Sequence, residues 1–134
     1  MSNKYLIVIV EDEYNISSFV SAVLQANGFD TMVARNGAEA IILITSHCPD
    51  LVLLDLGLPD MDGQGIIENV RGWSNVPIIV VSARTRERDK VMALESGADD
   101  YITKPFSVVE VLARVKANIR RTTEYAAPIQ EPEE

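Results

Sequence analysis

Apolar residues along this chain fall into two patterns, short unbroken runs and longer helical repeats. The unbroken runs lie at Leu6–Val10, Leu51–Leu54 and Pro77–Ser82, and they are rich in β-branched residues without polar alternation. Such runs are typical of strands that are buried on both faces of a parallel sheet. Shorter apolar stretches at Thr31–Ala34 and Tyr101–Thr103 predict two further strands.

Apolar residues at helical spacing follow each predicted strand. The five predicted helices run from Ile16 to near Gly28, Ala38–Ser46, Gln64–Arg71, Arg86–Ser96 and Val108 to about Arg121. The fourth helix is highly charged, and its only sizeable apolar anchors are Val91, Met92 and Leu94, so we expect it to be weakly held. Strands that alternate with helices predict an α/β fold with a parallel sheet between helix layers. Functional residues should then lie at the carboxyl ends of the strands.

Composition narrows the class of protein. The chain has 134 residues, enough for one domain, and its 20 acidic against 12 basic residues give a net charge of -8. This charge argues against direct nucleic-acid binding, so any DNA contact must come from another domain. A single cysteine, Cys48, excludes an internal disulfide, and we expect it to be a small buried hydrophobe. Because there is neither a membrane-spanning run nor a signal peptide, we expect a soluble cytoplasmic protein without membrane contact.

The end of the chain differs in character from the rest. The stretch Glu124–Glu134 lacks periodicity and contains Pro128 and Pro132, which is typical of a linker. We therefore expect one domain at residues 1–121. Residues 122–134 are expected to form a linker toward an absent C-terminal DNA-binding domain.

Chemically active side chains gather at the predicted strand ends. Glu11 and Asp12 follow the first strand and Asp55 follows the third, while Ser82 ends the fourth and Lys104 follows the fifth. Three neighbouring carboxylates would repel one another, and a divalent cation relieves that repulsion. Ligation by oxygen alone favours Mg²⁺ or Mn²⁺. A cation, a lysine and a hydroxyl are what phosphoryl transfer to a carboxylate requires, with Asp55 as the nucleophile.

Each of these residues also has an ordinary structural interpretation. The acidic loop Glu11–Glu13 could cap a helix, Ser82 could simply end a strand, and Lys104 could be a solvated surface lysine. Their shared location at the strand ends favours a functional site.

Two other functions fit the same architecture less well. A phosphohydrolase of the haloacid-dehalogenase type would need a second aspartate two residues after Asp55 as general acid, but that residue is Gly57. A flavodoxin-like flavin binder would need a phosphate-cradling loop after the first strand. The acidic loop Glu11–Glu13 would repel that phosphate.

Five ordered motifs resemble the receiver domain of bacterial two-component response regulators. They are Glu11-Asp12, the loop Asp55–Gly63, Ser82-Ala83, Gly97–Tyr101 and Lys104–Phe106. The resemblance runs from Tyr5 to about Arg121. It implies a flavodoxin-like (CheY-like) doubly wound, five-stranded parallel sheet of strand order 2-1-3-4-5, with helices on both faces.

The resemblance also implies a chemistry for the strand-end residues. In this family Asp55 would accept a phosphoryl group from the phosphohistidine of a sensor histidine kinase. Mg²⁺, or Mn²⁺ in its place, would be held by Asp12, Asp55 and the backbone carbonyl of Gly57, with Glu11 acting through water. Lys104 would bind a phosphoryl oxygen. The domain would be a signalling switch that catalyses only its own phosphorylation and dephosphorylation, not an enzyme.

A second set of residues would carry the signal. Ser82 would hydrogen-bond the phosphoryl group and, by moving, draw Tyr101 inward; the family more often has threonine at the Ser82 position. The resemblance further implies a cis peptide bond between Lys104 and Pro105. It also implies that Gly57 and Arg84 influence the access of water to the phosphorylated site. A receiver that regulates without phosphorylation is a further alternative, but the complete set of acids, hydroxyl and lysine argues against it.

The run Asp99–Phe106, followed by Glu110, Arg114, Arg120 and Arg121, is similar to the winged-helix (OmpR/PhoB) class of transcription factors. In that class the face made by the fourth helix, fifth strand and fifth helix forms a symmetric homodimer on phosphorylation. The implied interchain pairs are Lys90 with Glu110 and Asp100 with Arg114. Solvated surface charges are the alternative interpretation. The sequences of Leu54–Pro59 and Ser82–Lys90 resemble those of potassium-response regulators of the KdpE type.

Overall fold

Five parallel strands form one sheet in the order β2-β1-β3-β4-β5. The computed structural model describes the backbone of residues 4–126 and the side chains of residues 4–122. The predicted parallel sheet and its 2-1-3-4-5 order are confirmed. The strands are β1 (Leu6–Val10), β2 (Asp30–Ala34), β3 (Leu51–Leu54), β4 (Ile78–Ser82) and β5 (Asp100–Thr103).

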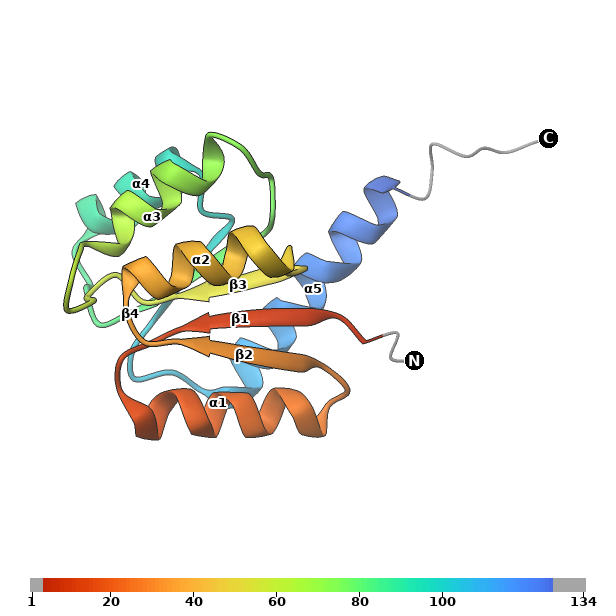
Figure 1. The fold of residues 1–134 in the computed structure, drawn as a ribbon. Helices are drawn as coiled ribbons and strands as arrows, with labels where there is room; N and C mark the ends of the chain where they lie inside the picture. The colour runs from red at the N-terminus through yellow and green to blue at the C-terminus, as the bar shows by residue number, and fades with distance from the viewer. Residues whose placement is uncertain (1–3, 127–134) are drawn as a thin grey trace.

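Helices cover both faces of the sheet, as predicted (Figure 1). One face carries α2, α3 and α4, and the other carries α1 and α5. The helices are α1 (Tyr14–Ala26), α2 (Gly37–His47), α3 (Gly63–Arg71), α4 (Glu87–Ser96) and α5 (Val108–Ala126). No helix in the described part of the chain is long and apolar enough to cross a membrane.

The unbroken apolar runs supply two separate cores. Successive side chains of a strand point to opposite faces, so Val8 and Val10 of β1 enter the core beneath α2 and α3. Ile7 and Ile9 enter the core beneath α1 and α5. Each such fully buried side chain stabilises the fold by about 1.5–3 kcal/mol. Burial on both faces is therefore the reason that β1 shows no polar alternation.

The pairing of β1 with β3 brings the acidic residues together. In this parallel pair Val10 lies opposite Leu54, so Glu11 and Asp55 leave the sheet side by side. The backbone N–H of Asp55 donates to the carbonyl of Val10 at 3.0 Å. The strand register thus decides which side chains meet at this end of the sheet.

The buried face of α4 differs from the prediction. Its one buried residue in the described structure is Ala93. The expected anchors Val91, Met92 and Leu94 are 42%, 52% and 45% exposed, so their assignment as anchors was wrong. Ala93 lies on the buried side of the helix, whereas the three larger apolar residues are exposed. These three side chains form an apolar surface on α4.

Two further details correct the sequence prediction. Cys48 is exposed and not buried, because it is the C-cap of α2, where its backbone is left-handed with φ 45°. The last helix continues to Ala126, past the expected boundary at residue 121. The remainder of the predicted linker, residues 127–134, lies outside the described residues, and the linker stays a prediction.

Candidate functional site

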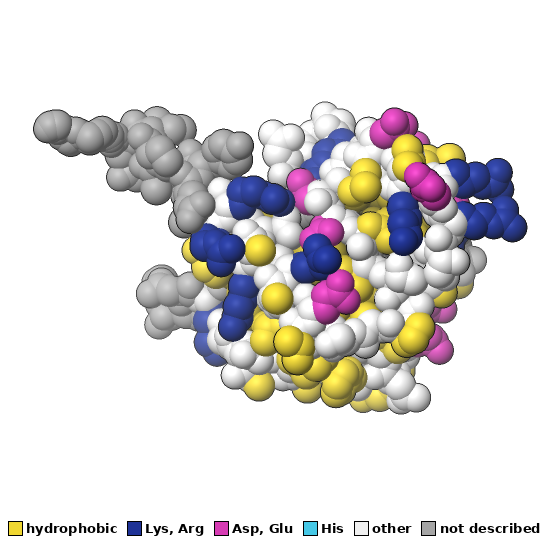
Figure 2. All heavy atoms as spheres, turned by 180° about the vertical axis from the view of Figure 1, so that it is seen from behind, with side chains coloured by type: hydrophobic (Ala, Val, Ile, Leu, Met, Phe, Trp, Pro, Cys, Tyr) yellow, Lys and Arg dark blue, Asp and Glu magenta, His cyan; other side chains and the backbone are white. Residues whose placement is uncertain are grey.

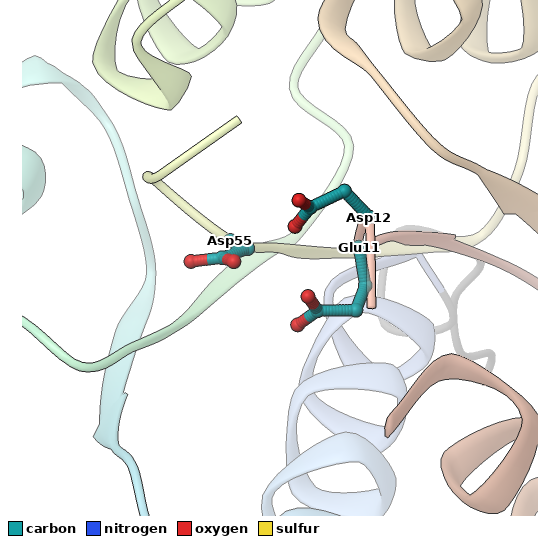
Figure 3. A group of neighbouring side chains, drawn as sticks. All are labelled: Glu11, Asp12 and Asp55. Carbon is teal, nitrogen blue, oxygen red and sulfur yellow. The ribbon is translucent and has the colours of Figure 1, made fainter. Parts of the chain in front are cut away.

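Three carboxylates meet where β1 and β3 end (Figure 3). Glu11, Asp12 and Asp55 each offer an oxygen atom, and these atoms all lie within 4.8 Å of one another. Glu11 is 4% exposed and Asp55 is 8% exposed, whereas Asp12 is exposed to solvent. The structure thus brings together the three acids that the sequence predicted.

Lys104 joins this cluster from the end of β5, a strand at the edge of the sheet. Its Nζ donates to Glu11 Oε1 at 2.7 Å and lies 3.3 Å from Asp55 Oδ2. The residue directly follows β5 and precedes Pro105, and the peptide bond between them is cis, as expected. Burial alone would lower the pKa of Lys104, but its hydrogen bond to Glu11 and the charge of Asp55 raise that pKa above its ordinary value. Lys104 is therefore a fixed positive charge between two carboxylates.

The cluster holds more negative than positive charge. Burial raises the pKa of Glu11, and the charge of Asp55 raises it further, although the hydrogen bond from Lys104 opposes the rise. Three carboxylates face a single lysine, so one more cation fits the charge of the site. Oxygen ligands from Glu11, Asp12 and Asp55 suit Mg²⁺ or Mn²⁺. The donor set is thus compatible with a divalent cation. The carbonyl ligand predicted at Gly57 stays a prediction.

Ser82 lies on β4, which is next to β3, and Tyr101 lies on β5, which is next to β4. Ser82 ends β4 and is 1% exposed, and its Oγ accepts a hydrogen bond from the backbone N–H of Arg84 at 3.1 Å. The Tyr101 hydroxyl donates to the carbonyl of Arg84 at 2.8 Å. Burial raises the pKa of Tyr101, which keeps this hydroxyl protonated as a donor. Both predicted switch residues therefore contact the same loop.

The loop after β3 contains two acids whose contacts the sequence did not indicate. Asp60 accepts hydrogen bonds from the backbone N–H groups of Gly37 and Ala38, at 2.7 and 3.0 Å, and so caps α2. These bonds lower the pKa of Asp60. Asp62 caps α3 by accepting from the N–H of Gln64 at 2.9 Å. An aspartate that precedes a glycine at a helix start is the signal that could have identified Asp62 as a cap.

A shallow groove lies beside Lys104, between α1 and the β5–α5 connection. It has a volume of about 550 Å³ and borders the carboxylate cluster through Lys104. Phe19 of α1 is 53% exposed there. The groove is lined by Asn15, Ile16, Phe19, Ala83, Lys104, Pro105 and Phe106. An apolar surface thus adjoins the acidic site.

The four residues predicted for a dimer face have contacts within the single chain. Arg114 pairs with Asp100 at 3.0 Å and with Glu110 at 3.2 Å. Lys90 Nζ lies 5.9 Å from the centroid of the Tyr101 ring. An interchain pair between Asp100 and Arg114 would therefore have to exchange an existing partner.

Comparison with known proteins identifies the family. The family model of the response regulator receiver domain matches residues 7–116. The chain belongs to this family. Receiver domains are signalling switches rather than true enzymes, and the acidic cluster at Asp55 is consistent with their metal site.

Individual receiver-containing proteins are similar over most of this chain. It is 46% identical over 127 residues to the transcriptional regulatory protein KdpE of Mycobacterium tuberculosis, covering 95% of this chain and 56% of that protein. It is 43% identical over 122 residues to the KDP operon transcriptional regulatory protein KdpE of Escherichia coli K12, covering 91% and 54%. The receiver thus spans about half the length of these curated relatives.

A solved structure shows the same fold. The BeF3-activated N-terminal receiver domain of Klebsiella pneumoniae RstA superimposes with a TM-score of 0.82 at 34% identity, covering 86% of this chain and 98% of that one. The parallel sheet with its acidic end is therefore a receiver fold, and its sequence is similar to the matched part of the KdpE regulators.

Proposed function

We propose that this receiver takes a phosphoryl group on Asp55 from a sensor histidine kinase. The observation that carries the proposal is the Asp55 carboxylate, which is 8% exposed and held by Lys104 beside Glu11 and Asp12. An oxygen of Asp55 attacks phosphorus, a new P–O bond forms, and the P–N bond of the phosphohistidine breaks with its electron pair returning to the imidazole. The product is an aspartyl phosphate.

The surrounding residues have separate roles in this step. Lys104 balances charge that develops on a phosphoryl oxygen, because its Nζ already lies 3.3 Å from Asp55 Oδ2. Glu11, Asp12, Asp55 and the carbonyl of Gly57 would hold Mg²⁺ or Mn²⁺. When bound, that cation supplies positive charge that neutralises the phosphoryl oxygens. Ser82, whose Oγ accepts from the N–H of Arg84, would donate a hydrogen bond from its hydroxyl to the phosphoryl group.

The groove beside α1 supports a protein as the phosphodonor. It is largely apolar, and Lys104 forms both part of its lining and part of the acidic cluster. A partner helix that packs an apolar face against Phe19 and Phe106 would bring a histidine on that helix close to Asp55. Replacement of the exposed Phe19 by alanine is expected to slow transfer from a kinase but to leave labelling by acetyl phosphate unchanged. Equal slowing with both donors would contradict this assignment of the groove.

The output is a homodimer formed through α4, β5 and α5. The surface seen from behind Figure 1 shows basic, acidic and hydrophobic side chains interspersed (Figure 2). Val91 and Leu94 of α4 are exposed, which gives this face apolar area that a partner could bury. Lys90, Glu110, Asp100 and Arg114 would then pair across a two-fold axis.

Phosphorylation would shift a pre-existing equilibrium toward the dimer-competent surface. The added negative charge can be balanced by Lys104 and the cation. A phosphoryl oxygen can also accept a hydrogen bond from the Ser82 hydroxyl. DNA would be bound only through an absent C-terminal winged-helix domain, so that dimerisation controls transcription. By its likeness to the KdpE proteins, we assign the chain to the cytoplasmic control of a potassium response.

Two measurements test this function. Addition of acetyl phosphate and Mg²⁺ should label the protein once per chain, whereas steady release of phosphate from a phosphatase substrate would indicate a phosphohydrolase. Beryllofluoride with Mg²⁺ should shift sedimentation toward a dimer at micromolar concentrations. Unchanged sedimentation would contradict the dimer but not the phosphorylation.

A further inference from the structure

Arg84 connects two loops that lie on either side of the acceptor. We call residues 56–62, after β3, the acceptor loop and residues 83–86, after β4, the switch loop. The guanidinium of Arg84 reaches Asp62 with both of its terminal nitrogens, Nη2 to Oδ2 at 2.9 Å and Nη1 to Oδ1 at 3.3 Å. Nη2 also lies 3.4 Å from the carbonyl of Leu56. The Arg84 side chain therefore joins the switch loop to both ends of the acceptor loop.

The backbone of Arg84 contacts both switch residues. Its N–H donates to Ser82 Oγ at 3.1 Å, and its carbonyl accepts from the Tyr101 hydroxyl at 2.8 Å. A change in the position of this backbone must alter both hydrogen bonds. The same residue thus holds the acceptor loop with its side chain and the switch residues with its main chain.

Asp62, the acidic member of the ion pair, is connected to Asp55 through the acceptor loop. The N–H of Gly57 donates to Asp55 Oδ1 at 3.2 Å, and Gly57 pairs with Asp62 in an antiparallel bridge. The loop is closely packed at Gly63, where a Cβ atom would lie 2.6 Å from the carbonyl oxygen of Asp55. A displacement of the loop at Asp55 is therefore passed on to Asp62.

We propose that the Arg84–Asp62 ion pair positions the switch loop, so that the state of the acceptor loop sets the Ser82 and Tyr101 hydrogen bonds. This proposal rests on the proposed phosphorylation of Asp55. The side chains of the pair are 36% and 53% exposed, so a simple surface pair would contribute little. What distinguishes it is the two-nitrogen geometry together with the contact to Leu56, which gives a rigid link between two loops.

Conservative variants separate the charge of this pair from its other contacts. Asp62→Asn keeps the α3 cap, since asparagine caps a helix about as well as aspartate, but it removes the charge. Arg84→Gln removes the guanidinium, and Arg84→Lys keeps the positive charge without the planar fork. The matched control is Arg35→Gln, which makes the same change in charge at a side chain that lies over the Tyr14 ring.

The test follows Tyr101 while beryllofluoride occupies the site. Fluorine NMR reports bound beryllofluoride with Mg²⁺, and carbon NMR of labelled tyrosine reports Tyr101, whose signal is assigned with Tyr101→Phe. In the native chain the Tyr101 signal should move on saturation. In Asp62→Asn and Arg84→Gln the ratio of the two Tyr101 states should respond about threefold less, the size expected for a partly exposed ion pair. Arg84→Lys should be intermediate, and Arg35→Gln should match the native chain.

The outcomes separate this inference from the proposed function. If the native chain binds no beryllofluoride, the phosphoacceptor function is wrong. If all variants bind it and Tyr101 responds as in the native chain, the positioning role is wrong while the function stands. If Asp62→Asn and Arg84→Gln fail to bind it, the pair belongs to the acceptor itself, and the positioning role is again wrong.

Discussion

Removal of one carboxylate from the acidic cluster should stabilise the metal-free protein. Asp12 is the suitable residue because it is exposed and its side chain has no hydrogen bond or ion pair among the described residues. Asp12 and Glu11 are neighbours in the chain, so they repel one another in the unfolded protein as well. The repulsion that folding creates is therefore mainly the one between Asp12 and Asp55.

The size of this repulsion follows from the distance between the carboxylates. Oxygen atoms of the two side chains lie within 4.8 Å. Two unit charges at that distance repel by about 0.9 kcal/mol in water and by about 3.5 kcal/mol at an effective dielectric constant of 20. Because Asp12 is exposed, the true value lies near the lower figure. We expect Asp12→Asn to raise the free energy of unfolding by about 1 kcal/mol when metal is absent.

Urea unfolding with EDTA and with Mg²⁺ tests this expectation. The native chain should gain stability from Mg²⁺, by about 1.4 kcal/mol at ten times the dissociation constant. Asp12→Asn should gain less, so its advantage should vanish when Mg²⁺ is present. Glu13→Gln is the control, since it removes one charge from the same loop outside the cluster. If Asp12→Asn is no more stable than the native chain in EDTA, the electrostatic description of the site is wrong.

Three further changes have expected outcomes. Lys104→Met should destabilise the fold by about 2 kcal/mol in urea unfolding, because Glu11 loses a buried partner, and an unchanged midpoint would contradict this. The lowered pKa of Asp60 means that its cap stabilises the fold above the unfolded pKa and is lost as pH falls through the folded one. Asp60→Asn should thus cost more stability at pH 7 than at pH 3. A cost that is the same at both pH values would show that the negative charge of Asp60 does not contribute to the cap. Gly97→Ala should lower stability by about 1–2 kcal/mol, since φ is +123° and the new Cβ would lie 2.6 Å from Arg71 Cγ; a neutral result in thermal unfolding would refute the strain.

The sheet and its acidic end could be predicted from local patterns. Residues 6–10 and 51–54 are apolar without alternation because both faces of these strands are buried. A parallel sheet then places the residues that follow each strand at one edge, so Glu11 and Asp55 could be brought together without coordinates. This part of the site depends on the parallel direction of the strands and on the pairing of β1 with β3.

Other features depend on contacts that no local pattern contains. Phe19 has the spacing of a core residue, but it lies over the open groove beside Phe106 instead. Asp60 caps α2 across 23 positions of sequence, and Arg84 pairs with Asp62 across 22. Cys48 is apolar in character, yet it sits at a helix end where its left-handed backbone turns it outward. These details follow from how the loops fold onto one another.

Intact mass after incubation with acetyl phosphate and Mg²⁺ tests the central claim most directly. The native chain should gain one phosphoryl group, and Asp55→Asn should gain none, because its amide is not a nucleophile. The asparagine variant should remain folded, since a neutral side chain at this position removes one charge from a crowded acidic cluster. Labelling that persists in Asp55→Asn would place the acceptor elsewhere, and an unlabelled native chain would contradict the phosphoacceptor function.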